Sequence, residues 1–274
     1  MPATSDRSSA TSDRQPATQK TSIRRPTACM QQPKEKKMEF GYRIFDFELI
    51  GQVDLPLIQI SVLRTSESDI QRVKILSDHI KSAGKRYVIH PMDVYLSDTQ
   101  KVVRDHNLKQ VKRFAEMADL GLIIHDEVMP SRQKLDEERQ ENYRAGLAEL
   151  EQICPVSIEN ARDSKNAPWF WETFARRITF DIGHFESEGI DSLELTGTLS
   201  PELVQKLDSV HLHRSNGLKP NGLIDHWPVI PGCRELKTLR KLSELKPDIK
   251  VILEVDTAND ILESRLALRA ESLL

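Results

Sequence analysis

A carboxylate and an imidazole follow one short apolar run near the middle of the chain. In the stretch Ile178-Thr-Phe-Asp-Ile-Gly-His-Phe185, Asp181 and His184 lie three residues apart at the end of an expected buried strand. Aspartate and histidine side chains bind divalent metals, whereas an apolar core buries such groups only at a cost. The stretch therefore indicates a metal site.

The same arrangement recurs along the chain. Six successive strand candidates end in a residue that can bind a metal ion: His90, His125, Glu159, Asp181, His211 and Glu254. Carboxylates gathered in one pocket repel each other unless protons or a cation offset their charge. Because imidazoles accompany them, we predict that these six residues bind a divalent metal and are numerous enough for more than one ion. Mixed carboxylate and imidazole ligands suit Mn²⁺, Co²⁺ or Zn²⁺.

Four polar residues beside these ligands are candidates for binding substrate: His184, His213, Arg162 and His226. His211 and His213 lie two apart on one strand, so their side chains share a face, and one can bind metal while the other supports it or contacts substrate. His226 could reach the metal instead. Arg162 could equally pair with Asp163.

The elements that position these residues alternate along the chain. The expected strands are short, rich in Ile and Val, and apolar on both faces, as parallel strands covered on both sides are. They are Gly41–Phe45, Leu57–Leu63, Tyr87–Ile89, Leu120–Ile124, Val156–Ile158, Ile178–Phe180, Val210–Leu212 and Val251–Leu253. Helix-compatible segments separate most of them: Ser66–Ala83, Ser97–Ala118, Gln133–Ile153, Pro201–Leu207, Arg234–Leu245 and, after the last strand, Ala258–Leu273.

Eight strands separated by helices predict an α/β protein with a (β/α)8 TIM barrel. The first unit is expected to be degenerate, because residues 46–56 are too few for a full helix and contain Gly51 and Pro56. The alternative is a doubly wound open sheet, although no glycine-rich phosphate loop follows the first strand. The barrel is expected over residues 38–274. Its strand ends would then bring distant ligands into one pocket.

The first 37 residues differ from the rest in composition. They hold eight Lys and Arg against three acids, are rich in Ser, Thr, Gln and Pro, and show no apolar periodicity. Such a segment is expected to form a disordered basic tail. Met38 directly precedes the folded pattern and is a candidate natural start.

Composition also limits the partners. The formal net charge of −3 together with a basic tail leaves an acidic body, which disfavours nucleic acid as the main ligand while allowing a local basic groove. No apolar run approaches the ~20 residues that span a bilayer. Three widely spaced cysteines, Cys29, Cys154 and Cys233, form no CxxC pair and fit a reducing compartment, so we predict a cytoplasmic protein without membrane attachment. The oligomeric state is left open.

From about Met38 onward, the chain resembles the xylose-isomerase-like TIM-barrel superfamily. This group includes sugar-phosphate isomerases and epimerases and the endonuclease IV type of apurinic-site nuclease. In the sugar enzymes, Glu, Asp, His and Glu from four strands hold one metal. The matching residues are Glu159 in SIEN, Asp181 in FDIGH, His211 in VHLH and Glu254 in LEVD, and His184 also matches.

The nuclease branch has two earlier strand-end histidines, which resemble His90 in VIHP and His125 in IIHD. It also has an Asp-x-His pair in the loop after the VHLH-like strand. Here that loop reads Ile224-Asp225-His226, so the aspartate lies one place too close to the histidine. The chain therefore departs from the complete three-metal nuclease pattern.

The resemblance implies a metal-dependent isomerase or epimerase of a small sugar, polyol or keto-sugar, or its phosphate. Glu159 and Glu254 would act as the catalytic carboxylates that take and return a proton beside a metal-polarised carbonyl. The alternative is a metal-dependent phosphoesterase that resembles the nuclease branch. A third possibility is a barrel without turnover that acts as a binding protein.

Overall fold

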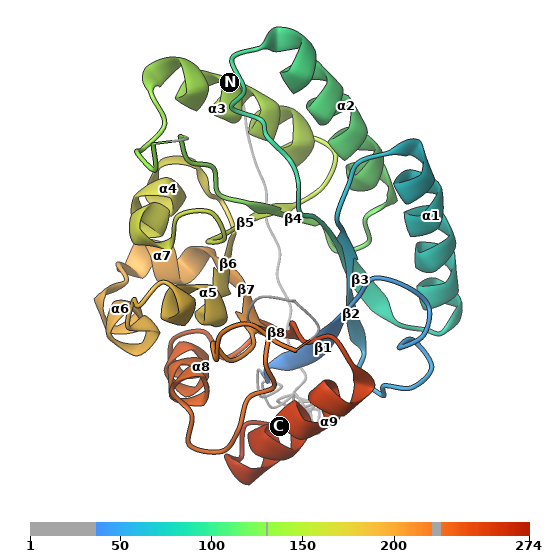
Figure 1. Ribbon diagram of the computed structural model, residues 1–274, viewed down its shortest axis with the longest axis vertical. Coiled ribbons are helices and arrows are strands. Elements are labelled where there is room, and N and C mark those ends of the chain that lie inside the picture. The colour runs from blue at the N-terminus through green and yellow to red at the C-terminus, as the bar shows by residue number, and fades with distance from the viewer. Residues whose placement is uncertain (1–36, 130, 221–225) are drawn as a thin grey trace, which may run out of the picture. The chain divides into compact units, whose positions relative to one another are not determined.

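The computed structural model describes residues 37–129, 131–220 and 226–274. Eight strands pair in sequence order and close into a barrel, because β1 pairs with both β2 and β8 (Figure 1). Each of the eight strand pairs is parallel. The structure confirms the (β/α)8 barrel and rules out the open sheet. The predicted disordered tail lies outside the described residues, apart from Lys37.

Each strand falls on one of the apolar runs that the sequence marks. The strands are β1 (Glu39–Ile44), β2 (Leu57–Val62), β3 (Arg86–Pro91), β4 (Leu122–His125), β5 (Val156–Glu159), β6 (Ile178–Asp181), β7 (Leu207–Leu212) and β8 (Lys250–Leu253). Their side chains are almost all buried, both those that point into the barrel and those that pack under the surrounding helices. Burial on both faces explains why the runs lack a polar alternation.

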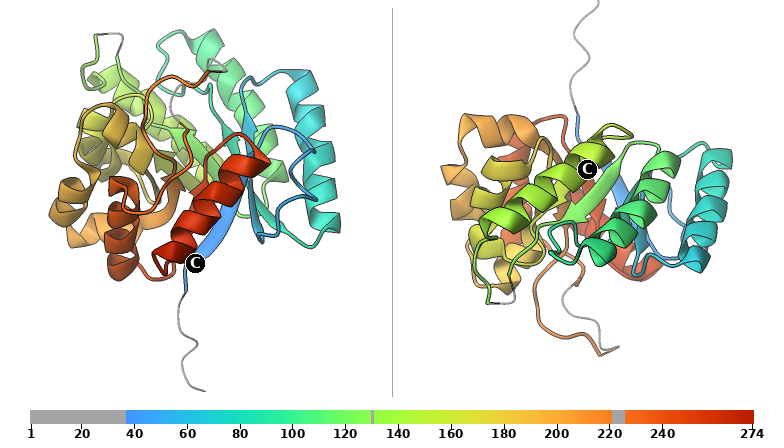
Figure 2. Two further views of the ribbon diagram at one scale, coloured as in Figure 1. Left: turned by 60° about the horizontal axis from the view of Figure 1, so that its bottom comes forward. Right: turned by 90° about the horizontal axis from the view of Figure 1, so that it is seen from above.

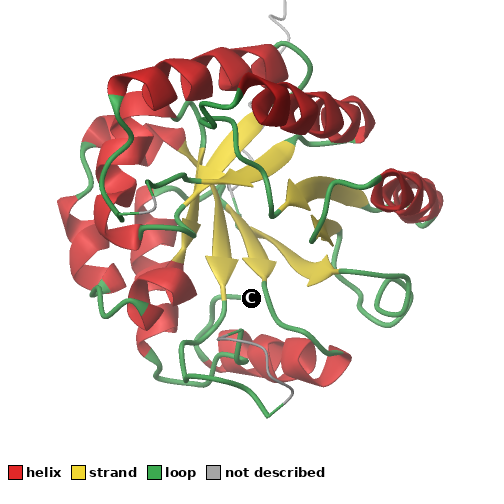
Figure 3. Ribbon diagram, turned by 45° about the horizontal axis from the view of Figure 1, so that its top comes forward, coloured by secondary structure: helices red, strands yellow, loops and turns green. Residues whose placement is uncertain are grey.

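Helices surround the strands, as Figures 2 and 3 show. They are α1 (Glu67–Ser82), α2 (Lys101–Met117), α3 (Glu137–Glu151), the 3₁₀ turn η1 (Ser164–Asn166), α4 (Ala167–Phe174), α5 (Ile182–Ser187), α6 (Ser192–Thr198), α7 (Pro201–Lys206), α8 (Arg234–Leu245) and α9 (Ala258–Ala270). Ser200 caps α7 by accepting a hydrogen bond from Leu203 N. Asp163 precedes η1 and makes no side-chain capping bond.

The first barrel unit is degenerate, as the sequence predicts. Residues 45–56, all of them described, form turns and no helix. Ile50, Val53 and Leu55 of this segment are buried, and the Tyr42 hydroxyl donates to Leu49 O at 3.2 Å. A packed loop therefore covers the barrel where a helix would otherwise lie.

A row of hydroxyl groups crosses the barrel interior. Ser157 Oγ lies 2.7 Å from Thr179 Oγ1, which lies 2.8 Å from Ser209 Oγ, and all three residues are buried. Residues two apart on a strand share a face, so the residues two positions further along β5, β6 and β7 also face inward. These are the metal-ligand candidates of the three strands.

Two features bear on the surroundings of the protein. Within the described part of the chain, no helix combines the length and apolar character needed to cross a bilayer. Cys154 and Cys233 are both free thiols.

Candidate metal centre

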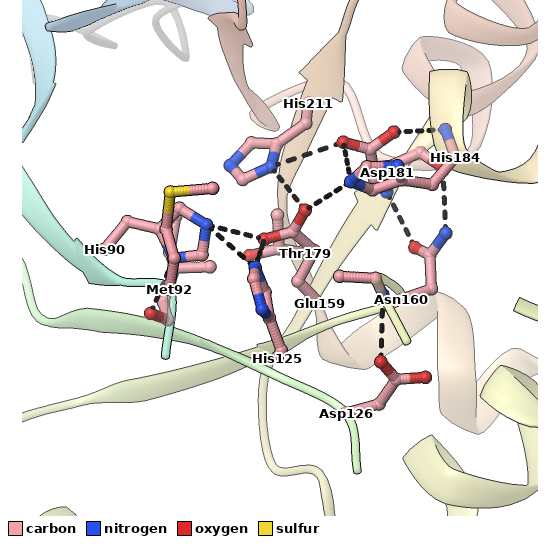
Figure 4. Close-up of polar contacts among 12 residues, drawn as sticks. His90, Met92, His125, Asp126, Glu159, Asn160, Thr179, Asp181, His184 and His211 are labelled. Carbon is pink, nitrogen blue, oxygen red and sulfur yellow. Dashed lines mark hydrogen bonds and ion pairs between the residues drawn. The ribbon is translucent and has the colours of Figure 1, made fainter. Parts of the chain in front are cut away.

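Strand pairing brings distant candidate ligands side by side. His125 is the register partner of Glu159 across β4 and β5, and Asp181 is the partner of His211 across β6 and β7. Four side chains from different strands offer ligand atoms that all lie within 4.8 Å of one another: Glu159, Asp181, His211 and Glu254. Figure 4 shows the first three of them. All four residues are at most 1% exposed. The predicted convergence of these four residues is therefore what the structure shows.

His211 lies at the centre of this four-residue group. Its Nδ1 atom is 3.1 Å from Glu159 Oε1, 3.6 Å from Asp181 Oδ2 and 3.6 Å from Glu254 Oε1. Among the described residues, neither ring nitrogen of His211 and neither carboxylate oxygen of Glu159 has a hydrogen-bond partner. Buried polar atoms are rarely left in this state. A divalent cation that these atoms bind would satisfy them, so the donor set fits a metal ion.

A second group shares Glu159 with the first and adds His90 and His125. His90 Nε2 is 3.1 Å from Glu159 Oε2 and 3.2 Å from His125 Nε2. His90 Nδ1 lies 2.9 Å from the carbonyl oxygen of Ile123, so it carries the ring proton and donates it there. The lone pair on His90 Nε2 then faces the other two groups. This is how metal-bound histidines are oriented.

Burial and the attraction between opposite charges shift the pKa values of the centre's side chains in opposite directions. Burial raises the pKa of Glu254, but His211 and Arg43 outweigh it and hold that pKa at about 2. Burial also raises the pKa of Glu159, while His211 and His90 bring it well below its usual range. Burial lowers the pKa of His211, yet Glu159 and Glu254 raise it well above 6.5. Without a metal, a protonated His211 supplies the positive charge that the carboxylates require.

Two residues that sequence reasoning missed hold Glu254 in place. Gln59 of β2 donates from Nε2 to Glu254 Oε1, and Arg43 of β1 lies 3.4 Å from Glu254 Oε2. Both are fully or nearly fully buried. The sequence does hint at their role, since Arg43 and Gln59 interrupt apolar strands. A polar side chain inside a strand that is covered on both faces needs a buried partner.

Two loops reinforce the strand ends. The Asn160 side chain donates to Asp181 O and accepts from Asp181 N, which ties the end of β5 to the end of β6. The Asp126 carboxylate accepts hydrogen bonds from the backbone amides of Ala161, Arg162 and Asp163. Burial raises the pKa of Asp126 to about 6 against these three donors. The residues after Glu159 are therefore fixed by β4 and β6.

The candidate substrate-binding histidines differ in their access to solvent. The His184 side chain is 25% exposed, and its Nε2 lies 3.6 Å from Glu159 Oε1 and 3.7 Å from Asp181 Oδ2. The His226 side chain is 15% exposed and contacts Arg43. His213 is fully buried and faces Asp181. His184 is thus the most solvent-accessible of these three histidines.

Arg162 lies beside the centre. Its guanidinium donates to Met92 O, lies 3.6 Å from Asp93 Oδ1 and stacks over the ring of Tyr95. Its ion-pair partner is thus Asp93, and the alternative pairing with Asp163 is wrong. Arg162 also lines a hollow of about 460 Å³ over the loops after β3, β4 and β5.

The aromatic stretch after Glu159 packs into the fold. Trp171 and Phe170 are almost fully buried, and Trp171 Nε1 donates to Ile158 O at 3.1 Å. Packing is therefore the role of these two rings. Asp225 of the Ile224-Asp225-His226 stretch lies outside the described residues.

Comparisons with known proteins show a likeness in fold. No family model matches the chain, and no curated protein does. Among solved structures, a D-tagatose 3-epimerase-like protein aligns with a TM-score of 0.65 at 19% identity, covering 85% of this chain and 96% of that one. D-psicose 3-epimerase from Clostridium cellulolyticum H10 aligns at 0.58 and 11% identity, covering 86% and 99%. SacUVDE aligns at 0.56 and 14% identity, covering 86% and 100%.

These likenesses define the class of the fold. The chain has the barrel found in sugar 3-epimerases and in SacUVDE, which agrees with the resemblance drawn from its motifs. Among the described residues, its strand ends carry four overlapping groups of His, Asp and Glu side chains that could hold a metal ion. Besides the two groups described above, Asp181, His184 and His213 form one, and His213, His226 and Glu254 form another.

Proposed function

We propose that the protein is a metal-dependent isomerase or epimerase of a small sugar, polyol or keto-sugar, or its phosphate. The observation that supports it most is the placement of Glu159 and Glu254. One oxygen of each carboxylate approaches the same nitrogen, His211 Nδ1, from a different strand, at 3.1 and 3.6 Å. Two carboxylates on either side of one metal position suit a reaction that removes and returns a proton.

The chemistry follows from these groups. A divalent ion held by Glu159, Asp181, His211 and Glu254 would polarise a substrate carbonyl and acidify the neighbouring C–H. One carboxylate takes that proton and the other, or the same one, returns it. The two have different partners, since histidines surround Glu159 while Arg43 and Gln59 hold Glu254. The pKa of each carboxylate is lowered, so either one starts ionised as a base and becomes the acid once it holds the proton.

Solvent exchange tests this proposal. The metal-loaded protein is incubated in D₂O with a panel of ketoses, aldoses and their phosphates, and products are read by NMR. We expect deuterium at the carbon next to the carbonyl together with an epimer or positional isomer. Glu159→Gln and Glu254→Gln should each slow exchange at least about a hundredfold. Glu263→Gln, at an exposed position on α9, is the matched control. A metal-loaded protein that exchanges no proton on any member would contradict the proposal.

A second candidate, a metal-dependent phosphoesterase, is favoured by one specific observation. His90, His125 and Glu159 form a second possible ion position that an isomerase with one metal does not need. Two neighbouring ions suit hydrolysis, since they can activate water and stabilise a leaving oxygen. Glu159 would connect the two positions, with Oε1 toward His211 and Oε2 toward His90.

Assays on different substrates distinguish the two candidate functions. A duplex with an abasic site and an activated phosphodiester are offered to the protein loaded with Zn²⁺ or Mn²⁺. Cleavage that His90→Asn abolishes, without proton exchange on sugars, would favour the phosphoesterase. Stable metal binding with neither activity would instead favour the binding protein without turnover.

A further inference from the structure

The histidine at position 213 has two polar neighbours, one on each ring nitrogen. The backbone N–H of His226 donates to His213 Nδ1 at 3.2 Å. On the other side of the ring, His213 Nε2 lies 3.1 Å from Asp181 Oδ1 and 3.3 Å from Asp181 Oδ2. His213 and Asp181 are fully buried, so water does not replace either contact.

These contacts fix where the ring proton lies. An amide N–H only donates, so His213 Nδ1 must present its lone pair to His226. A neutral imidazole carries one proton, which must then be on Nε2. That proton points at the Asp181 carboxylate and forms a hydrogen bond with it. A protonated Nε2 has no lone pair for a metal ion.

His90 shows the opposite arrangement in the same barrel. Its Nδ1 donates to the carbonyl oxygen of Ile123, which leaves the lone pair on Nε2 facing the centre. His90 is therefore prepared to bind an ion, whereas His213 is prepared to donate. The backbone group on the far side of each ring, a carbonyl in one case and an amide in the other, makes the difference.

The backbone around His213 is adapted to hold the ring in place. A Cβ atom at Gly183 would lie 2.1 to 2.5 Å from three ring atoms of His213, so only glycine leaves the ring its room. His226 adopts a φ of 49°, in the left-handed region that non-glycine residues rarely use. Its ring lies 4.3 Å from that of His213 between centroids. The backbone is therefore constrained on both sides of the imidazole, by the need for glycine at 183 and by the left-handed conformation of His226.

The contact with His213 helps to orient the Asp181 carboxylate. Its Oδ1 accepts the backbone N–H of His184 at 2.7 Å, and His213 Nε2 contacts both carboxylate oxygens, at 3.1 Å from Oδ1 and 3.3 Å from Oδ2. Oδ2 also faces His211 Nδ1 at 3.6 Å. The carboxylate is thereby oriented before any metal arrives.

We propose that His213 is a positioning residue, which donates from Nε2 to Asp181, rather than a metal ligand or a substrate contact. The His226 amide fixes its tautomer, and Gly183 gives its ring room. The inference rests on the proposed metal centre insofar as Asp181 is a ligand, and it replaces the substrate-binding role that the sequence suggested for His213.

The proton position is tested directly by NMR. Full-length protein labelled with ¹⁵N-histidine is compared without metal and with Zn²⁺, and the His213 ring is assigned by its loss in His213→Gln. We expect an unprotonated Nδ1 and a protonated Nε2 in both states. A His213 ring that carries its proton on Nδ1, or that loses the Nε2 proton when Zn²⁺ binds, would overturn the inference.

Metal affinity tests the positioning role. In competition with a chelator, His213→Leu should bind Zn²⁺ about 10- to 100-fold more weakly, as loss of a partner to a metal ligand typically does. His213→Gln keeps an N–H donor at a similar reach and should restore most of the affinity. The number of ions bound should not change in either variant. Unchanged affinity in His213→Leu, or loss of an ion in His213→Gln, would contradict the role.

A double-mutant cycle separates this role from general damage to the fold. Gly183→Ala should lower both thermal stability and Zn²⁺ affinity because its Cβ displaces the ring. Adding His213→Ala removes the clash, so the double variant should behave as His213→Ala does alone. Gly197→Ala is the matched control, since a Cβ there meets nothing within 4 Å. Additive effects of the two changes would argue against the contact.

These experiments also distinguish failure of the inference from failure of the proposed function. A protein that binds no divalent metal would end the proposed function. The spectrum of the metal-free protein and the double-mutant cycle would still decide whether His213 donates to Asp181.

Discussion

Arg43, on the first strand of the barrel, lies against Glu254, which follows the last strand. Their closest atoms, Arg43 Nη1 and Glu254 Oε2, are 3.4 Å apart, and each side chain is only 2% exposed. Arg43 Nη2 also lies 2.6 Å from Asp256 Oδ1. The residues that close the barrel thus also set the charge around a candidate metal ligand.

Removing this arginine should be costly. Arg43→Met keeps much of the side-chain volume but leaves Glu254 and Asp256 without their cation. Breaking one partner of a buried pair typically costs about 3–5 kcal/mol, and we expect metal-free Arg43→Met to lose that much unfolding free energy. Because an ion would supply part of the missing positive charge, added Zn²⁺ should raise the melting temperature more in the variant than in the wild type. Denaturant and thermal unfolding measure both effects.

The matched control is an arginine in an exposed pair. Arg234 pairs with Asp191, and their side chains are 51% and 38% exposed. Surface pairs of this kind contribute about 0–1 kcal/mol, so Arg234→Met should change stability little. Equal losses in the two variants would show that burial of the Arg43 pair is not what matters.

Two buried histidines should weaken the metal-free protein in acid. Burial lowers the pKa of His125 to about 3 and that of His226 to about 2, so both stay neutral when folded. Unfolded histidines titrate near 6.5, so below that pH these two residues favour the unfolded state, which binds more protons. Asp126, whose pKa burial raises to about 6, keeps its proton in the folded state and opposes them between about pH 6 and pH 4. Below about pH 4 the depressed pKa of Glu254 adds to the loss of stability, because the unfolded carboxylate takes up its proton first.

On the alkaline side His211 acts with the opposite sign. Its pKa is raised well above 6.5 by Glu159 and Glu254 against burial, so the folded state holds this proton while the unfolded state has lost it. The stability it contributes is complete below about pH 6.5 and is lost as pH rises, at about 1.4 kcal/mol per pH unit for each proton. Urea unfolding of chelator-treated protein from pH 3 to 9 would measure the curve. A monotonic rise from pH 5 to 9 would contradict it.

The barrel and the convergence of its candidate ligands could be predicted from the sequence for a common reason. The strands are buried on both faces, so each appears as an apolar run, and in a parallel barrel all strand ends open on one side. A polar residue directly after such a run, such as Glu159 or His211, therefore has a predictable location. Even the missing first helix was predictable, since residues 46–56 are too few to form a full helix.

Other features depended on contacts that no local pattern reveals. Arg43 and Gln59 lie inside apolar runs, and their partner Glu254 is about two hundred positions away. The role of His213 depends on which backbone group faces its far nitrogen, and that group belongs to His226, in an irregular loop. Spacing placed both histidines correctly near the candidate ligands but could not say which nitrogen carries a proton.

The Asp126 carboxylate holds the loop after β5, and its removal gives a further prediction. Asp126 accepts backbone hydrogen bonds from Ala161 at 2.9 Å and from Arg162 at 2.6 Å. Asp126→Ala would leave these amides without a buried acceptor, at an expected cost of about 3 kcal/mol in unfolding free energy. If Arg162 contacts substrate, KM should rise more than kcat falls. Arg162→Met should reproduce the change in KM without the loss of stability, and a stable Asp126→Ala would show that the loop is held by other contacts.

Metal stoichiometry offers the sharpest prediction about the centre, because Glu159 belongs to both groups. Its Oε2 faces His90 at 3.1 Å, and its Oε1 faces His211 at the same distance. His90→Asn should therefore remove the ion of one group and leave the other, so that bound metal falls by one equivalent. Glu159→Gln should weaken both, and Asp181→Ala should remove the ion beside His211.

Elemental analysis after dialysis against a weak chelator measures these equivalents, with Glu263→Gln as control. A wild-type protein that holds two ions, of which His90→Asn loses one, would favour the phosphoesterase over an isomerase with one metal. A single ion that survives in His90→Asn but is lost in Asp181→Ala would favour the isomerase, because the two flanking carboxylates would then serve one metal. Full retention of metal in Asp181→Ala would exclude the four-residue group as the binding site, and with it the proton transfer assigned to Glu159 and Glu254.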